Sequence, residues 1–341
     1  MDIYILSSEA ISCQDTFDKN ELFVSEPELP SGRFQKSLSP DFKQYIDARL
    51  IRRMSGVLRM GVAAAASCLR RAGLEKPDSI IVGTGLGCMD DTVKFLNLMY
   101  ENKEQMLNPT PFIQSTHNTI AGQIALMMGC KGHNLSYSQK SLSFAAGLLD
   151  AMMVLRDGEA QNILVGGIDE LHDAVNELME LSGCVNPKDT TFYSEGAAFF
   201  LLSTERGASS SRLLDIKIFH KVSDEAALKN ELSSFLKGNN LSLEDIDLLV
   251  SGENGSSAYD GYYDLLKDEL RESSVVRYKH LTGEHQSATA FGLFLAARMI
   301  ESQRADTFTL LRLGRNKDIG KVLIFNYSKN ADFSFILLQK V

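Results

Sequence analysis

Apolar residues recur at steps of three and four along residues 51–72, and this spacing predicts an amphipathic helix with Gly73 just beyond its end. Residues 142–156 are almost wholly apolar, so a helix formed there must be buried. Further helices are predicted at 90–103 and 118–128. Short apolar or alternating runs between them predict strands at 80–82, 134–138, 162–167 and 197–203.

The second half of the chain repeats this order of elements. Helices are predicted at 223–237, 262–271 and 285–300, and strands at 214–222, 246–251, 307–313, 321–327 and 333–338. Alternating strands and helices favour an α/β fold. Residues 133–167 and 275–313 both run strand, loop, apolar helix, strand, which indicates two related halves. A polar, serine-rich joint at 203–211 predicts a division into residues 1–204 and 205–341.

Composition narrows the class of protein. The 341 residues are 44% apolar and 23% charged, with a net charge of −9, which disfavours a general nucleic-acid binder because such proteins need a basic surface. The five cysteines are scattered without a C-x-x-C pair, and no H-x-x-x-H pair occurs, so neither a disulfide framework nor a metal site is expected. Because no signal peptide or membrane-length apolar run is found, we expect a cytoplasmic, enzyme-like protein.

A glycine-rich run, Gly83-Thr84-Gly85-Leu86-Gly87, follows the predicted strand at 80–82. It lacks the G-x-G-x-x-G spacing of dinucleotide sites and the GK[ST] sequence of a P-loop. A tight turn from strand to helix is therefore favoured over a phosphate-binding loop.

More specific phrases occur in a fixed order along the first 200 residues. They are Arg52-Arg53-Met54-Ser55, Val82–Gly87, Asn108–Phe112, Ser115–Ile124, Gly132–Asn134, Gly158–Ala160, Val165–Glu170 and Ser194–Ala198. This set resembles the N-terminal half of a β-ketoacyl-acyl-carrier-protein synthase, a condensing enzyme of the thiolase fold. The resemblance is strong over about 50–204 and weaker over 245–295. It implies two similar βαβαβαββ-type halves in αβαβα layers, a dimer and an acyl tunnel.

The resemblance also implies where the reactive positions fall. The nucleophilic cysteine of the family corresponds to Ser141, its two histidines to Asn254 and Glu284, and its lysine to Lys279. A serine hydroxyl needs an adjacent base, which Asn254 cannot supply. A carboxylate at Glu284 opposes the negative charge of an enolate unless it is protonated or paired with Lys279. Autonomous condensation is therefore not expected.

Two alternatives concern the identity of these positions. Ser141 is favoured as an ordinary helix N-cap over a nucleophile. A shift of two residues would place Gln139 at the nucleophile position, and a shift of one would let His285 replace a missing histidine, although neighbouring side chains on a helix point about 100° apart.

The pattern is similar to that of chain-length factors, which keep this fold, lack the nucleophile and pair with an active synthase. The leading hypothesis is thus a condensation-deficient partner subunit in fatty-acid, aryl-polyene or polyketide synthesis. The alternatives are an atypical synthase or acyltransferase that uses Ser141, and a non-catalytic acyl-binding scaffold that forms a homodimer.

Expected partners are acyl carrier protein, whose phosphopantetheine is the substrate arm, and an active synthase or a second copy; no separate cofactor is expected. Candidate contacts are Phe112, Thr116, Asn118 and His285 for the acyl chain, and Arg52, Arg53 and Arg59 for the carrier protein.

Overall fold

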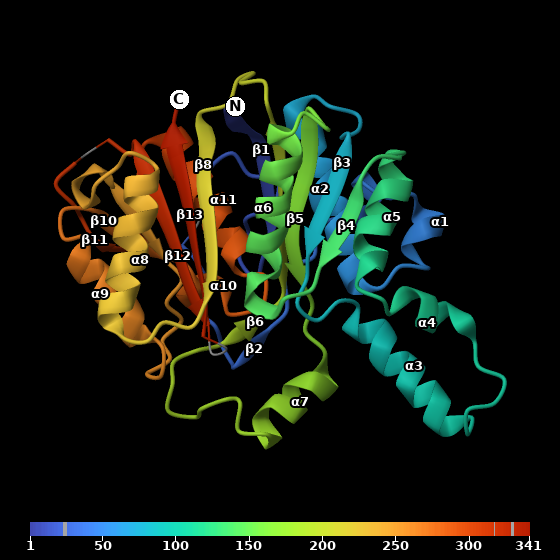
Figure 1. Cartoon of the computed structure of the whole chain (residues 1–341). Helices are drawn as coiled ribbons and strands as arrows, with labels where there is room; N and C mark the ends of the chain where they lie inside the picture. The colour runs from blue at the N-terminus through green and yellow to red at the C-terminus, as the bar shows by residue number, and fades with distance from the viewer. Residues whose placement is uncertain (23–25, 317, 329–330) are drawn as a thin grey trace.

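Strands from both ends of the chain meet in one continuous sheet (Figure 1). The computed structural model describes residues 1–22, 26–316, 318–328 and 331–341, and within them an 11-stranded sheet runs in the order β11-β10-β9-β12-β13-β8-β1-β7-β5-β3-β4. The strands of the first half are β1 (Ile3–Ile11), β3 (Ser79–Gly83), β4 (Asn134–Tyr137), β5 (Asn162–Asp169) and β7 (Gly196–Ser203). Those of the second are β8 (Ser211–His220), β9 (Leu248–Ser251), β10 (Ser274–Arg277), β11 (Leu310–Arg312), β12 (Lys321–Ser328) and β13 (Asp332–Lys340). A separate two-stranded sheet pairs β2 (Phe34–Gln35) with β6 (Tyr193–Ser194).

The two halves of the sheet have the same internal pattern. In the first half β4, β3 and β5 are parallel and β5 then pairs antiparallel with β7. In the second half β10, β9 and β12 are parallel and β12 pairs antiparallel with β13. This equivalence confirms the prediction of two related halves. However, the strand that closes the second unit is β12, not the segment 307–313, because β11 pairs antiparallel with β10 at the sheet edge.

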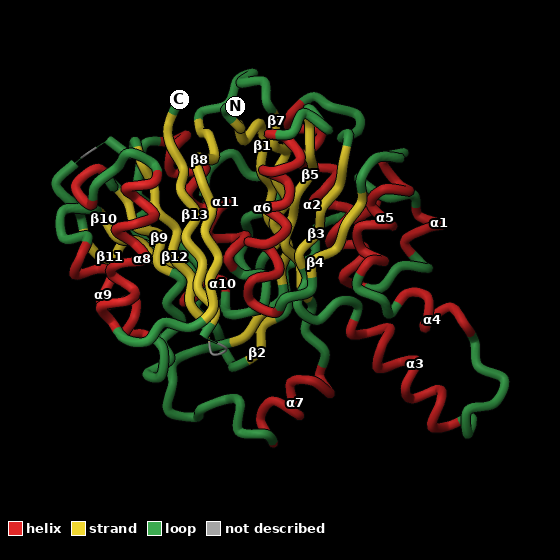
Figure 2. The backbone as a smooth tube through the Cα atoms, in the orientation of Figure 1, coloured by secondary structure: helices red, strands yellow, loops and turns green. Residues whose placement is uncertain are grey.

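Helices complete five layers, α/β/α/β/α (Figures 1 and 2). The helices are α1 (Ala48–Ile51), α2 (Gly56–Ala72), α3 (Met89–Glu101), α4 (Pro109–Gln114), α5 (Asn118–Met128), α6 (Ser143–Arg156), α7 (Asp173–Leu181), α8 (Glu225–Gly238), α9 (Asp260–Glu269), α10 (Lys279–Thr282) and α11 (Thr289–Ser302). One outer layer is α2 with α5, and the other is α8 with α9. Between the half-sheets lie α6 and α11, whose apolar side chains share one core with both. The prediction that the apolar helix at 142–156 is buried is therefore confirmed.

Close contact between strand and helix explains one glycine of the predicted turn. At Gly83, the end of β3, a Cβ atom would lie 2.5 Å from backbone atoms of Ser143 and Phe144 in the first turn of α6. Only glycine lets the strand approach the helix so closely. Gly73 has a φ of 69° and ends α2, as its sequence position predicts.

Local geometry changes two of the predicted elements. The helix predicted at 51–72 is interrupted, because Ser55 adopts an extended backbone and α2 starts only at Gly56. The helix α7 was not predicted, although Val175, Leu178 and Leu181 recur at three-residue steps; in the single chain its only buried residue is Asn176. Within the described residues, no helix combines the length and the apolar character needed to cross a bilayer.

Candidate functional site

Three of the four sequence-predicted reactive positions form one hydrogen-bonded cluster. Glu284 Oε2 accepts a bond from Asn254 Nδ2 at 2.7 Å and another from Lys279 Nζ at 2.8 Å. Lys279 Nζ also donates to Asn326 Oδ1 at 2.8 Å. We call Asn254, Lys279, Glu284 and Asn326 the carboxylate cluster.

The carboxylate cluster lies at the carboxyl ends of parallel strands. Asn254 follows β9, Lys279 begins α10 just after β10, and Asn326 lies near the end of β12. Since β9 pairs in parallel with both other strands, these three ends meet at the same edge of the half-sheet. In α/β sheets this is the edge where ligands bind.

Ser141 reaches the same region from the first half of the chain. It lies in a 3₁₀ turn (Lys140–Leu142) after β4, and its Oγ is 2.6 Å from Ser328 Oγ and 3.3 Å from Asp332 Oδ2. Ser328 and Asn326 are two residues apart on β12, so their side chains share a face and lie roughly 7 Å apart along the strand. Ser141 therefore adjoins the carboxylate cluster, although it makes no hydrogen bond to it.

The prediction that Ser141 is a helix N-cap is wrong. Its hydroxyl is directed to Ser328 and Asp332, and Ser143 Oγ instead accepts the N–H of Gln139 at 2.8 Å. Asp332 is itself held by His220, with 2.9 Å between Nδ1 and Oδ1. The structure thus gives Ser141 a carboxylate neighbour that sequence reasoning missed.

Burial divides the carboxylate cluster into hidden and accessible members. The Lys279 side chain is 2% exposed and that of Glu284 is 22% exposed, while Asn254 is also partly exposed. The ammonium group of Lys279 is consequently committed to Glu284 and Asn326 rather than to an incoming anion. Burial, together with the charge of Glu284, raises the pKa of the neighbouring Tyr193 to about 12, so its phenol is neutral at pH 7.

A loop of the first half, residues 189–194, bonds to the residues that flank the carboxylate cluster, and we call it the strap. Thr190 donates its N–H to Gly255 O, and Asp189 accepts bonds from the hydroxyls of Ser256 and Ser257. At its end, Ser194 N donates to Glu284 O. Because Asn254 Oδ1 accepts the N–H of Ser256, the strap and the 254–257 turn hold the Asn254 amide in one orientation.

His285 faces the carboxylate of Asp169, not that of Glu284, its neighbour in sequence. Its Nδ1 is 3.2 Å from Ser287 Oγ and 3.9 Å from Asp169 Oδ2, so it does not join Asn254 and Lys279. Burial alone would raise the pKa of Asp169, but hydrogen bonds from His285 and Ser287 and the charge of His285 lower it overall. Asp169 Oδ1 also accepts the N–H groups of Gly85 and Leu86. The glycine-rich run is therefore a tight turn whose N–H groups are bonded within the chain.

Three of the four predicted acyl-chain residues lie on the surface of the single chain, and the side chain of the fourth, His285, is 10% exposed. Phe112 is 55% exposed and packs against Phe95 with 5.2 Å between ring centroids, and Thr116 and Asn118 are also exposed. Phe112 belongs to an apolar arm formed by α3, α4 and the loop between them, which projects from the body in Figure 1, whereas Thr116 follows the arm and Asn118 begins α5. The exposed apolar side chains of the arm are Leu96, Tyr100, Met106, Phe112 and Ile113.

The predicted docking arginines flank this apolar arm. Arg52 and Arg53 are exposed between α1 and α2, and Arg53 O accepts a bond from Gln114 Nε2 at the end of α4. The guanidinium of Arg59 is 5.7 Å from the ring centre of Phe42. Within the described residues the side chains of Arg52 and Arg53 make no hydrogen bond or ion pair, whereas Arg59 is packed against Phe42.

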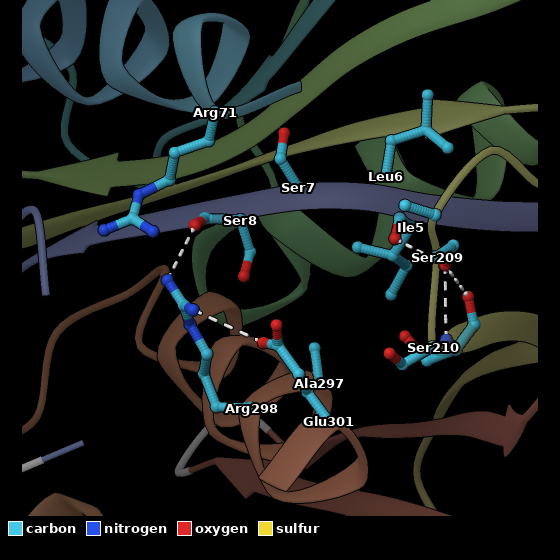
Figure 3. A pocket seen from close by; sticks show the side chains of 12 residues that line it. Ile5, Leu6, Ser7, Ser8, Arg71, Ser209, Ser210, Ala297, Arg298 and Glu301 are labelled. Atoms are coloured by element: carbon cyan, nitrogen blue, oxygen red, sulfur yellow. Dashed lines mark hydrogen bonds and ion pairs between the residues drawn. The ribbon is translucent and has the colours of Figure 1, made fainter. Parts of the chain in front are cut away.

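Two cavities lie away from the carboxylate cluster. The larger, about 150 Å³, lies where β1 separates from the second half, between β1, residues 208–211 and α11 (Figure 3). Arg298 crosses it to reach Ser8 O at 3.4 Å and Glu301 at 3.4 Å. The smaller one borders His285, Ser287 and Thr282. Neither of these two cavities is lined by Ser141 or Asn254.

Asn326, Ser328, Asp332 and His220 were missed by sequence reasoning. A usable signal existed for the first two, because polar side chains at 326 and 328 interrupt an otherwise apolar strand. No comparable signal marks Asp332 or His220, since their pairing depends on the register of β8 against β13.

Comparison with known proteins agrees with this architecture. Residues 30–184 match the family model described as β-ketoacyl synthase, N-terminal domain. The chain is also similar over 137 residues to the 3-oxoacyl-[acyl-carrier-protein] synthase 2 of Vibrio cholerae serotype O1, at 25% identity, and to that of Vibrio harveyi, at 24%. Each match covers 38% of this chain and 33% of the relative, so the chain aligns with about a third of the length of these curated relatives.

Solved structures match over the whole chain. The ishigamide ketosynthase/chain length factor has a TM-score of 0.79 at 15% identity, and a β-ketoacyl synthase from Burkholderia phymatum has 0.79 at 13%. A type II polyketide synthase acyl-carrier protein in complex with its ketosynthase also gives 0.79, at 14% identity. Each match covers 100% of this chain and 99% of the other. The chain therefore has the α/β, thiolase-like fold of ketosynthases.

Proposed function

We propose that this protein is a condensation-deficient subunit that partners an active synthase, because residues 30–184 match the β-ketoacyl synthase N-terminal domain and the whole chain has the ketosynthase fold. It would act on chains carried by acyl carrier protein in fatty-acid, aryl-polyene or polyketide synthesis. Its role would resemble that of a chain-length factor.

The observation that carries the proposal is that, in the carboxylate cluster, the hydrogen-bond donors of Lys279 and Asn254 are already bonded to Glu284. Condensation develops negative charge on an enolate, which needs hydrogen-bond donors or cations in the site. Here Glu284 supplies a carboxylate and already binds the Lys279 ammonium and the Asn254 amide. An enolate would therefore compete with Glu284 for both donors.

The nucleophile position supports the same conclusion. Residues 137–143 contain no cysteine, and a serine hydroxyl is a much weaker nucleophile than a thiolate. Ser141 is only 6% exposed and its hydroxyl is bonded to Ser328 and Asp332. Gln139 precedes the 3₁₀ turn and Ser141 lies within it. Because neither glutamine nor serine has a thiol, neither alignment provides a thiolate.

The apolar arm supports the expectation of a partner subunit. Side chains such as Met106, Tyr100 and Ile113 are 101%, 89% and 62% exposed in the single chain. Contiguous apolar surface of this kind is typical of an interface. The arm would cover the partner's surface and place Phe112, Thr116 and Asn118 beside the acyl chain.

The exposed pair Arg52 and Arg53 would serve the carrier protein. Acidic carrier surfaces are attracted to such basic side chains, which increases the rate of encounter more than the final affinity. The phosphopantetheine arm would then carry the acyl group towards the carboxylate cluster.

The direct test combines assembly with activity. The chain is co-expressed with a synthase that has an intact Cys-His-His set, purified by a tag on one subunit, and analysed by native mass spectrometry. We expect a heterodimer, and no condensation of malonyl-carrier protein by this chain alone. Robust turnover by the chain alone that is lost in Ser141→Ala, with an acyl ester mapped to Ser141, would establish the acyltransferase alternative. An inactive, stable homodimer that retains acyl chains would establish the scaffold alternative.

A further inference from the structure

The carboxylate cluster leaves one oxygen of Glu284 available. Oε2 receives both the Lys279 and the Asn254 hydrogen bonds, whereas Oε1 has no hydrogen-bond partner within the described residues. Asn254 uses one N–H of its amide on Glu284, so its second N–H remains available. Both side chains are partly exposed, while the Lys279 ammonium is buried behind them.

This arrangement places a hydrogen-bond acceptor, a donor and a buried positive charge next to one another. An acceptor of this kind can take a proton from water, and an amide N–H can stabilise an oxyanion. When Glu284 takes up a proton it loses its charge, and the buried Lys279 ammonium, which stays bonded to Asn326 and Glu284, then favours the nearby oxyanion through space. The Lys279 charge thus stabilises first the Glu284 carboxylate and then the oxyanion.

We propose that Glu284 and Asn254 hydrolyse acyl thioesters directly with water. Water oxygen bonds to the thioester carbonyl carbon while Glu284 Oε1 takes its proton, and the second N–H of Asn254 binds the oxyanion. The C–S bond then breaks, and the departing thiolate receives the proton from Glu284. The products are a carboxylic acid and a free thiol, with water as the only co-reactant.

Hydrolysis in this form does not require Ser141. That hydroxyl is buried and directed to Asp332, whereas the Glu284 carboxylate is the more accessible group. The activity rests on the proposed function only in that a thioester enters this site. In a partner subunit it would remove stalled or unwanted chains rather than extend them.

The experiment uses the isolated full chain and octanoyl-N-acetylcysteamine, a small thioester that needs no carrier-protein docking. Thiol release is followed with a chromogenic thiol reagent, and the reaction is repeated in H₂¹⁸O. We expect thiol release above the buffer rate and ¹⁸O in the octanoic acid. Glu284→Gln should lower kcat at least tenfold with little change in KM, and Asn254→Ala should also lower it. Glu301→Gln, a matched change on the exposed end of α11, should leave the rate unchanged.

If the Lys279–Glu284 pair were purely structural, replacing Glu284 in a folded variant would not change the rate of thioester hydrolysis. If wild type does not exceed the buffer rate, or if Glu284→Gln matches wild type, the proposal is overturned; an acyl ester on Ser141 also overturns it. Glu284→Asp keeps the charge for the ion pair with a shorter side chain, so it serves if Glu284→Gln does not fold. It should retain part of the activity. Because no synthase is present, these outcomes are independent of whether the heterodimer forms.

Discussion

At the scale of single residues, the buried charge of Lys279 depends on the carboxylate of Glu284. The Lys279 ammonium is buried, and its charge is compensated by the Glu284 carboxylate at 2.8 Å. Removing one partner of a buried ion pair leaves the other charge without compensation, which is far more damaging than losing a surface pair. The identity at 284 is therefore coupled to the lysine at 279.

Glu284→Ala should destabilise the protein because it isolates the buried ammonium. We expect a decrease in the free energy of unfolding of about 3 kcal/mol, less than for a fully buried pair since Glu284 is partly exposed. Urea denaturation followed by circular dichroism measures it. Asp15→Ala, which removes the exposed pair with Lys19, is the control and should have a smaller effect. Equal effects of the two variants would contradict the expectation.

Ser141→Cys should not restore condensation. The thiol would lie where the resemblance predicts the family's nucleophile, but neither 254 nor 284 is a histidine, and the Glu284 carboxylate would oppose the negative charge of an enolate. Condensation is measured with malonyl- and acyl-carrier protein by mass spectrometry of the product. A burst of β-ketoacyl product from Ser141→Cys alone would show that the carboxylate cluster is not the obstacle.

At the scale of elements, sequence pattern was most reliable where one face of a helix is buried. The helix α5 was predicted with its observed bounds, and α6 within one residue, because their apolar residues face cores. The helix α7 was missed although its apolar residues recur at helical spacing, and two of them, Leu178 and Leu181, are exposed in the single chain. In the arm, α3 was predicted as a helix at 90–103, but α4 was not, and neither was the projection of the arm as an apolar surface.

Disrupting the apolar arm should reduce assembly without unfolding the chain. Ile113→Asp replaces a side chain that is 62% exposed with a charge that would have to be desolvated in an interface. We expect at least a tenfold weaker association with the partner synthase, measured by analytical ultracentrifugation. Leu313→Asp changes a 75% exposed leucine near the opposite edge of the sheet and should associate normally. If both variants associate like wild type, the arm is not the interface.

At the scale of the whole molecule, the sequence indicated two halves but not how they meet. The candidate site depends on bonds between segments far apart in the chain, such as Ser141 with Asp332 and Asn254 with Glu284. Local patterns contain no information on such pairings, since strand order and register decide them. The family resemblance supplied Asn254, Lys279 and Glu284, whereas Asn326 and Asp332 required the fold.

Stability of the whole chain should depend on pH through Glu170. Burial, together with the charges of Asp90 and Glu195, raises its pKa from 4.5 to about 7, despite hydrogen bonds from the N–H groups of Asp90 and Val57. The folded state therefore binds more protons than the unfolded state between these values, and its contribution to stability is lost as pH rises through about 7. The change amounts to about 3 kcal/mol.

Glu170→Gln should remove this dependence. We expect the Tm of wild type to fall between pH 5.5 and pH 8 relative to that of Glu170→Gln, as measured by scanning calorimetry. Asp173→Asn, a nearby acidic residue on the exposed start of α7, serves as control. Parallel pH curves for wild type and Glu170→Gln would contradict a raised pKa at this carboxyl.

The position of β1 has a consequence for synthesis of the protein. This strand is synthesised well before its main neighbour, β7, with which it forms pairs such as Tyr4 with Ser203. At 5–20 residues per second, an apolar strand edge stays unpaired for roughly 10–40 s. Chaperone capture of the nascent β1 segment is therefore expected during translation. Silent codon changes that slow elongation before residue 196 should lower the soluble yield more than the same changes placed after residue 220.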